Sequence, residues 1–298
     1  MDVHTFSFFR LRNFAAFLFS AFLLAVPSAA QVTIAQLSDT HIGEKKHAPH
    51  AADNLRQAVQ MINDRRPDAV ILSGDIGESL QAWQEARSIL AGLKAPLYYA
   101  PGNHDVHSHD VDRYRKGFGK DYYSFQVKDV TFIVIDSELL ANIDVFDART
   151  PQPLPPETQE ESERMISWLE SQGAADPGKK EDKKRKHKDE SPSHIVIGVQ
   201  HIPVFRDGDF PRDSKPYWVI NDPYRSQEMK ALHDLGIKDM LVGHWHIGRV
   251  FEKDGITWHV APATSWLPMG GELGFAMHSI SPDGKVHTEF VNLPDARP

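Results

Sequence analysis

The chain has 298 residues, and its 33 Lys and Arg against 41 Asp and Glu give a formal net charge of −8. This length predicts one large domain or two small ones, with enough apolar residues for a core. The acidic balance argues against a general nucleic-acid-binding protein, which usually has a basic face. Cysteine is absent, which excludes disulfides, cysteine-ligated zinc and thiol nucleophiles. The 16 histidines direct attention to metal ligands.

The first 30 residues have the pattern of a secretory signal peptide. Arg10 and Arg12 form a small basic region, and the apolar run Phe14–Val26 follows. Small residues then precede a predicted cleavage after Ala30. The run is shorter than the roughly 20 residues that a membrane-spanning helix needs. We therefore expect a secreted or periplasmic domain over residues 31–298 without a stable membrane span, and an uncleaved anchor is the alternative.

Strand and helix patterns alternate in the first part of this domain. Apolar runs predict strands, and apolar residues at helical spacing predict helices. The expected order is strand Val32–Ser38, helix Ala52–Arg65, strand Ala69–Ser73, helix Leu80–Leu93 and strand Pro96–Ala100. This βαβαβ order favours a parallel sheet with helical crossovers. A hairpin over Tyr122–Val127 and Val130–Asp136 and a helix over Thr158–Ser171 are expected next.

The second part begins after a charged segment, residues 173–193. From Lys179 to Glu190 this segment has seven Lys or Arg, four Asp or Glu and no apolar residue. Such a composition predicts a solvated, flexible loop, with a surface for an anionic partner as the alternative. The elements expected beyond it are strand Ile195–Gln200, helix Arg225–Leu235, strand Asp239–Val242 and four short strands near 249–252, 256–260, 275–280 and 286–291.

Five short polar segments each follow an apolar strand-like run. They are Asp39-Thr40-His41, Gly74-Asp75, Gly102-Asn103-His104-Asp105, His201 and Gly243-His244-Trp245-His246. The carboxyl ends of strands are where open α/β sheets place their sites, so we expect the five segments to converge. Carboxylate, amide and imidazole donors suit manganese, iron, zinc or nickel.

The spacing within two of these segments suggests how they reach a metal. Residues two apart on an extended strand end point the same way, which applies to Asp39 and His41 and to His244 and His246. Asp75 has two carboxylate oxygens with which it can bridge two ions. Two ions about 3.5–4 Å apart are a known arrangement for displacement at phosphorus.

In this order, the five motifs resemble those of the calcineurin-like metallophosphoesterase superfamily. Its pattern is D-x-H, G-D-x-x-D/N, G-N-H-D/E, H and G-H-x-H. The segment Leu37–His41 looks most like the cyclic-nucleotide phosphodiesterase branch, and Gln200–Phe205 resembles the calcineurin-like phosphoesterase-domain phosphatases. The resemblance implies an α/β fold: a four-layer αββα sandwich of two mixed β-sheets flanked by helices.

The resemblance also implies a role for each matching residue. Asp39, His41 and His246 would hold one metal ion, Asn103, His201 and His244 would hold a second, and Asp75 would bridge the two. Neither ion is identified. A water or hydroxide between the ions would attack phosphorus. His104 would face the substrate as a catalytic group, with Asp105 holding its imidazole.

One position departs from the superfamily pattern. Glu78 stands where the family often has Asp or Asn, and it can fill an outer role around the metals. The purple acid phosphatase branch has Tyr there and no His in the first motif, so both differences count against that branch. Arg206 and Trp245 are weaker candidates for contact with substrate, since a surface position for Arg206 and core packing for Trp245 are the favoured alternatives.

These observations predict a secreted phosphoesterase with two metal ions. It would hydrolyse a phosphodiester or a phosphomonoester of small size, and the motifs do not distinguish the two. Two alternatives stay open: a non-catalytic interaction protein on the same fold, and a metal-binding or storage protein. The oligomeric state is not encoded in any readable pattern.

Overall fold

The computed structural model describes residue 1 and residues 31–106, 109–142, 146, 148–174, 195–208 and 215–298. The predicted signal peptide and most of the charged segment at 173–193 therefore lie outside the described residues. Within the described part, no helix combines the length and the apolar character that a membrane crossing requires.

Eleven strands form two mixed sheets in the described part. The first has the order β11 (Val286–Asn292), β10 (Gly274–Ile280), β1 (Val32–Leu37), β2 (Ala69–Ser73) and β3 (Leu97–Ala100). The second has the order β4 (Tyr123–Val127), β5 (Val130–Val134), β6 (Ile195–Val199), β7 (Asp239–Val242), β9 (Ile256–Val260) and β8 (Arg249–Lys253). The strands β1, β2 and β3 run parallel, as the βαβαβ pattern predicts. The central strands of the second sheet, β5, β6, β7 and β9, also run parallel.

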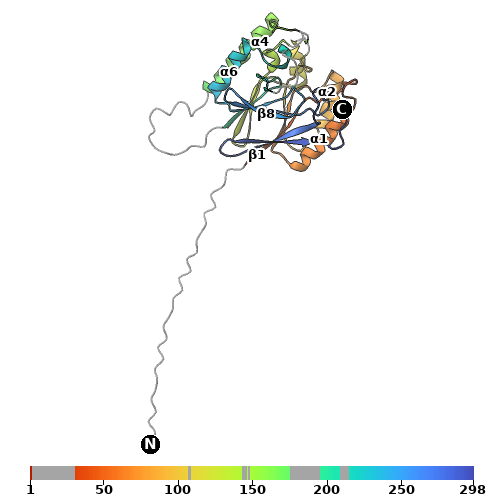
Figure 1. Ribbon diagram of the computed structural model, residues 1–298, viewed down its shortest axis with the longest axis vertical. Helices are drawn as coiled ribbons and strands as arrows, with labels where there is room; N and C mark the ends of the chain where they lie inside the picture. The colour runs from red at the N-terminus through yellow and green to blue at the C-terminus, as the bar shows by residue number, and fades with distance from the viewer. Residues whose placement is uncertain (2–30, 107–108, 143–145, 147, 175–194, 209–214) are drawn as a thin grey trace.

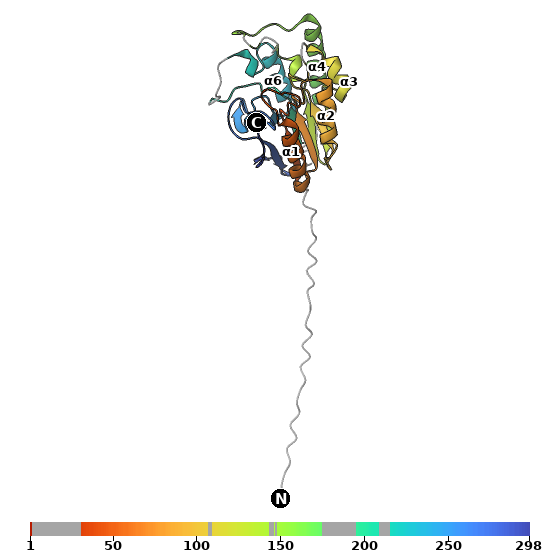
Figure 2. The ribbon, with the colours of Figure 1, turned by 90° about the vertical axis from the view of Figure 1, so that its right-hand side faces the viewer.

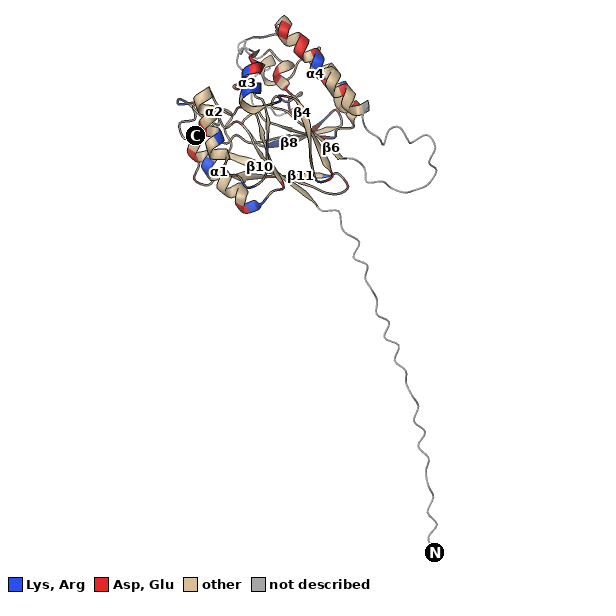
Figure 3. Ribbon diagram, turned by 180° about the vertical axis from the view of Figure 1, so that it is seen from behind, with Lys and Arg blue, Asp and Glu red and all other residues tan. Residues whose placement is uncertain are grey.

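Helices cover the outer faces of the two sheets. They are α1 (Ala51–Arg65), α2 (Leu80–Leu90), α3 (Val111–Phe118), α4 (Pro156–Ala174) and α6 (Tyr224–Leu235). Two short 3₁₀ helices, η2 (Ser137–Leu139) and η3 (Pro216–Trp218), lie in the loops after β5 and β6. Figure 1 shows α1 and α2 together on one side and α4 and α6 together on the other, and Figure 2 gives the view turned by 90°. Several acidic residues lie along α4, as Figure 3 shows.

Alternate residues of a strand point to opposite faces, and this alternation builds two kinds of core. Ile34 and Ile71 of the first sheet join Phe132 and Val199 of the second in a cluster between the sheets. The residues that alternate with these in the same strands, such as Leu37 in β1, point to the opposite face. They belong to the cluster that includes the apolar faces of the helices. The predicted four-layer αββα sandwich is confirmed.

Helix α3 was not expected from the sequence. It has only eight residues, and its apolar face consists of Val111, Tyr114 and Phe118. Asp110 starts the helix, because its carboxylate accepts a hydrogen bond from the backbone N–H of Arg113. Two turns with three apolar residues give too weak a periodic signal to stand out in the sequence.

A row of hydrogen bonds crosses between the two sheets. Asp239 contacts His259 at 2.9 Å, and His259 contacts Thr288 at 2.7 Å. Thr288 contacts His278 at 2.9 Å, and His278 contacts Gln36 at 2.9 Å. The Gln36 amide then donates to the hydroxyl of Ser73, at the end of β2. One part of the inter-sheet layer is therefore polar and fully bonded, and the rest is apolar.

Glu228 on α6 is the clearest source of pH-dependent stability in the fold. Its side chain is fully buried, and neither carboxyl oxygen has a hydrogen-bonding partner among the described residues. Burial raises the pKa of Glu228 to about 8, and the nearby Gln200 amide offsets only part of that rise. Between the unfolded pKa of about 4.3 and this folded value, the native protein keeps a proton that the unfolded chain has lost.

The free energy of unfolding should therefore decrease as pH rises through this window. We expect Glu228→Gln to remove this component. Between pH 5 and pH 8, the free energy of unfolding of wild type should therefore fall by about 2–4 kcal/mol relative to that of the variant. Urea unfolding of both proteins at several pH values measures the difference. Glu170→Gln, at an exposed position of α4, is the matched control and should follow wild type. Parallel pH profiles for wild type and Glu228→Gln would contradict the assignment.

Candidate metal centre

The seven predicted metal ligands come together where strands of both sheets end. Asp39 and Asp75 lie two residues beyond β1 and β2, and Asn103 lies three beyond β3. His201 and His244 lie two residues beyond β6 and β7. Because parallel strands bring their carboxyl ends to one edge, loops far apart in sequence meet there. The expected convergence is confirmed.

The local conformation differs from the expected one. The pairs do not continue an extended strand, because Asp39 (φ 52°), His41 (φ 41°), His244 (φ 69°) and His246 (φ 57°) are left-handed. Asp75 is left-handed as well (φ 54°). This region costs L-residues about 1–2 kcal/mol each, although Asp and His tolerate it better than most. The two residues of each pair therefore reach the centre through tight turns. The expectation that they continue an extended strand was wrong.

Two glycines make this close approach possible. Gly74 has φ 91°, and a Cβ atom there would overlap the ring of His201. A Cβ atom at Gly102 would overlap the backbone N and the carboxylate of Asp75. Neither position can take a side chain without displacing a predicted ligand. Close packing against the predicted ligands therefore explains why glycine occupies the first position of the G-D and G-N-H-D motifs.

On one side of the centre, potential ligand atoms of Asp39, His41, Asp75 and His246 lie within 4.8 Å of one another. His41 Nδ1 donates to the Glu78 carboxylate at 2.9 Å, and His246 Nδ1 donates to the Trp266 carbonyl at 2.8 Å. In neutral rings, both Nε2 atoms then present lone pairs, and they face each other at 3.2 Å. Asp39 Oδ1 is buried without a hydrogen-bond partner, 3.2 Å from His246 Nε2. Acceptors arranged in this way fit a cation between them.

The other side has the same character. Asp75, His201 and His244 form a second group, so Asp75 belongs to both. His201 Nδ1 donates to the Ser73 carbonyl at 2.7 Å, so Nε2, which lies 3.2 Å from Asp75 Oδ2, is the nitrogen that faces the centre and can offer a lone pair to a cation once its proton is lost. His244 Nε2 donates to the Tyr217 carbonyl at 3.0 Å, which leaves Nδ1 as its acceptor. These residues also fit a metal ion, with Asp75 placed to serve two.

Asn103 completes the second group. Its amide nitrogen lies 3.4 Å from the hydroxyl of Tyr217, and its Oδ1 atom is buried without a partner. The adjacent backbone N–H, that of His104, donates to Asp75 Oδ1 at 2.9 Å. The Asn103 oxygen is thus a further acceptor without a proton donor, as expected of a ligand to a hard cation.

The charges of the two aspartates depend on the histidines around them. Burial acts to raise the pKa of Asp39, but His246 and His201 together outweigh it and hold that pKa below its usual range. Burial also acts to raise the pKa of Asp75, but His201 and His104 lower it well below the usual value. Both carboxylates are therefore ionised at neutral pH and available to a cation.

His104 differs from the four other histidines in its exposure. Its side chain is 23% exposed, whereas the side chains of His41 and His201 are fully buried. Its Nδ1 contacts Glu78 Oε2 at 2.8 Å. Burial acts to lower the pKa of His104. The negative charges of Asp75 and Glu78 act in the opposite direction and more strongly, so that the pKa rises to about 9. The ring therefore carries a proton at neutral pH on the side of the centre that solvent reaches.

The expected role of Asp105 needs correction. Its carboxylate accepts hydrogen bonds from the backbone N–H groups of Ile76 (3.0 Å) and Gly102 (3.1 Å), so it ties together the loops after β2 and β3. The partner that holds the His104 ring is Glu78, which bonds His41 through its other oxygen. Asp105, next to His104 in the sequence, thus shapes the loop, while Glu78, 26 positions before His104, orients the ring.

Arg206 and Trp245 do not line the centre in the expected way. The guanidinium of Arg206 donates to the carbonyl of Lys215 and so braces the loop that contains it. Trp245 is fully buried, and its indole N–H donates to the Trp218 carbonyl at 2.9 Å. Its ring stacks on Phe251. A buried indole of this kind packs the core, so the substrate-contact prediction for Trp245 was wrong.

Two aromatic residues at the centre were missed. Trp266 accepts from His246 through its carbonyl, and its half-buried ring packs edge-on against His41 and His246. Tyr217 contacts Asn103 and His244. Each orients a predicted ligand ring through its backbone carbonyl, which any residue type has, so no side-chain pattern in the sequence indicates this role.

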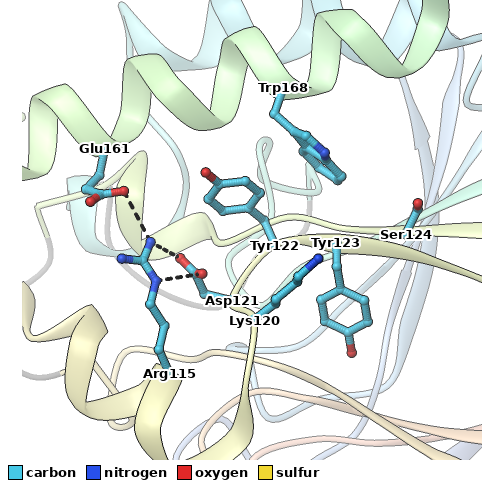
Figure 4. A pocket seen from close by; sticks show the side chains of 8 residues that line it. All are labelled: Arg115, Lys120, Asp121, Tyr122, Tyr123, Ser124, Glu161 and Trp168. Atoms are coloured by element: carbon cyan, nitrogen blue, oxygen red, sulfur yellow. Dashed lines mark hydrogen bonds and ion pairs between the residues drawn. The ribbon is translucent and has the colours of Figure 1, made fainter. Parts of the chain in front are cut away.

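A separate pocket of about 480 Å³ lies between α3, β4 and α4. Figure 4 shows Arg115 bonded to Asp121 and Glu161 on one wall, with Tyr122 and Trp168 nearby. None of the predicted site residues lines it. The predicted site residues therefore lie at the strand ends, at a place separate from this pocket.

Comparison with known proteins agrees with this geometry. A zebrafish (Danio rerio) protein named serine/threonine-protein phosphatase CPPED1 is 26% identical over 240 residues, which cover 76% of this chain and 68% of that protein. The human counterpart is matched over 57% of its length. The 3',5'-cyclic adenosine monophosphate phosphodiesterase CpdA of Escherichia coli is 33% identical over 93 residues, or 28% of this chain and 34% of CpdA.

The fold is similar to that of a dimetal phosphatase from Danio rerio, with a TM-score of 0.62 at 14% identity, covering 88% of this chain and 96% of that one. The family model described as calcineurin-like phosphoesterase matches residues 32–248 and so includes all five motifs. The chain belongs to the calcineurin-like phosphoesterase family, whose members are metal-dependent phosphoesterases.

Proposed function

We propose that this chain hydrolyses small phosphate esters with two metal ions. The observation that carries the proposal is the pair of overlapping acceptor groups that share Asp75. Each imidazole in these groups has one nitrogen bonded to a fixed acceptor, so its other nitrogen faces the centre and offers a lone pair when the ring is neutral. Such an array is unfavourable without cations and well suited to them.

We assign Asp39, His41 and His246 to one ion, with Asp75 shared. Asn103, His201 and His244 are assigned to the other. When bound, the ions would supply an activated water and neutralise charge on the phosphoryl group. The donor set of oxygen and imidazole suits manganese, iron, zinc or nickel, and the identity of the ions is left to measurement.

His104 handles the proton in this proposal. Glu78 fixes its Nδ1 side, so Nε2 is the nitrogen available to a substrate. A protonated ring at this position can give its proton to the leaving-group oxygen as the ester bond breaks. The relatives support both ester classes, since one is named a phosphatase and another a phosphodiesterase. We therefore propose activity on a phosphomonoester or a phosphodiester.

A non-catalytic metal-binding protein on the same fold is the alternative. It requires the ligand groups but has no use for an accessible proton donor. The exposed, protonated His104 held by Glu78 favours the enzyme.

We also propose that the chain is exported to the periplasm or secreted. The support is the order of the first 30 residues: a basic start, the apolar run Phe14–Val26 and small residues before a cleavage after Ala30.

The metal centre is tested by exchanging the ions and removing the shared ligand. Chelator-treated protein should be inactive, and manganese should restore hydrolysis of p-nitrophenyl phosphate, bis(p-nitrophenyl) phosphate or both. Asp75→Asn should lower kcat/KM by more than about 100-fold, because losing a direct ligand exceeds the 10- to 100-fold cost typical of an outer partner. Asp283→Asn, at an exposed ion pair, is the control. Full activity of Asp75→Asn would sink the shared-ligand assignment.

Replacement of His104 separates proton transfer from metal binding. His104→Ala should lower kcat/KM by about 10²–10⁴-fold. Two metal ions per chain should still bind, as measured by elemental analysis after gel filtration, because no ligand is lost. A loss of metal in parallel with activity, or no loss of activity, would refute the role in proton transfer.

Export can be followed with a C-terminal tag on the full chain. We expect the protein in the periplasm or medium, with a mass that lacks residues 1–30. Leu23→Arg interrupts the apolar run and should retain the full-length chain inside the cell. Recovery of uncleaved wild type from the membrane fraction would instead support the anchor.

A further inference from the structure

Tyr217 touches the candidate metal centre through both its backbone and its side chain. It lies in the 3₁₀ helix η3, and its carbonyl accepts the hydrogen bond that fixes the ring of His244. Its hydroxyl lies 3.4 Å from the amide nitrogen of Asn103. Neither the motifs nor the family match assigns a function to this residue, which lies between the fourth and fifth motifs.

The direction of the Asn103 contact leaves the tyrosine proton unused. An amide nitrogen can only donate, so the phenol oxygen accepts in this bond. The hydroxyl hydrogen is then available, and among the described residues no acceptor for it is recorded. The same contact turns the Asn103 oxygen, which is buried without a partner, away from the phenol. A proton donor and a predicted metal ligand therefore stand side by side.

Aromatic neighbours hold the ring in place. The Trp218 ring packs edge-on against it at a centroid distance of 4.8 Å, and the His244 ring lies at 4.8 Å in a tilted arrangement. The residue as a whole is half-buried and is not sealed in the core. The position of the hydroxyl is thus set before a substrate arrives, which reduces the entropy lost on binding.

We propose that Tyr217 is a further substrate-contacting residue, whose hydroxyl donates a hydrogen bond to a charged phosphoryl oxygen of the bound ester. The inference rests on the proposed phosphoesterase function. Bonds to a charged acceptor are about twice as strong as neutral ones, so a phosphoryl oxygen is a suitable partner for an otherwise unused donor. His104 acts on the leaving-group oxygen, and Tyr217 acts on an oxygen that stays with phosphorus.

Tyr217→Phe tests this directly, because it removes only the hydroxyl. The ring and the carbonyl that holds His244 are retained. In manganese-loaded protein, kcat/KM for p-nitrophenyl phosphate or bis(p-nitrophenyl) phosphate should fall by about 10- to 100-fold. Calorimetry should show a similar loss of affinity for inorganic phosphate, while metal content stays at the wild-type level. Tyr122→Phe, in the separate pocket of Figure 4, is the matched control and should behave as wild type.

The outcomes separate this inference from the proposed function. A wild-type protein that turns over neither ester and does not bind phosphate would refute the function, and the inference with it. An active wild type with an equally active Tyr217→Phe refutes the inference alone. If Tyr217→Phe loses metal and excess manganese restores its kcat/KM, Tyr217 positions Asn103 and does not contact substrate, which also overturns the inference. A loss of turnover and phosphate affinity at full metal content supports it.

Discussion

Two imidazole nitrogens that face each other at 3.2 Å are the constraint on which the rest of the centre depends. His41 and His246 each have the other ring nitrogen bonded to an acceptor, the Glu78 carboxylate for one and the Trp266 carbonyl for the other, so in the neutral rings two lone pairs face each other. Asp39 adds an unpaired oxygen to the same space. Groups of this kind repel one another, and burial adds the cost of removing them from water. A fold that keeps them together must be stabilised elsewhere.

The sandwich supplies that stability on both sides of the centre. Strands from two sheets end at one edge, and their apolar residues are buried between the sheets and under the helices. The backbone also fixes the loops themselves, because the N–H groups of Asp39 and His41 donate to carbonyls of Gly74 and Asp75. The strained left-handed residues are therefore held by the structure around them, as is common at functional sites. The cations would remove the remaining repulsion, which couples metal binding to the stability of these loops.

The sequence predicted the elements more reliably than the contacts between side chains. Strand β2 has the predicted bounds, because a continuous apolar run has few competing interpretations. Helix α3 escaped detection, since its face has too few apolar residues. The left-handed conformation of Asp39 and His41 was missed, because Asp and His tolerate that region better than most residues but also adopt the ordinary ones. Glu78 and Asp105 show the same limit: the family resemblance implied that Asp105 holds His104, whereas the turn after β3 directs that carboxylate to backbone N–H groups.

The hydrogen-bond row between the sheets extends this logic beyond the centre. Gln36 must present its oxygen to His278, because its nitrogen donates to Ser73 and to the Val242 carbonyl. Burial holds the pKa of His278 well below its usual value, so its neutral ring donates from Nε2 to Gln36 and accepts from the Thr288 hydroxyl at Nδ1. The Thr288 oxygen in turn accepts from His259 Nδ1. The row ends at Ser73, whose carbonyl orients His201, so the hydrogen bonds of the inter-sheet layer reach the residue that positions a predicted metal ligand.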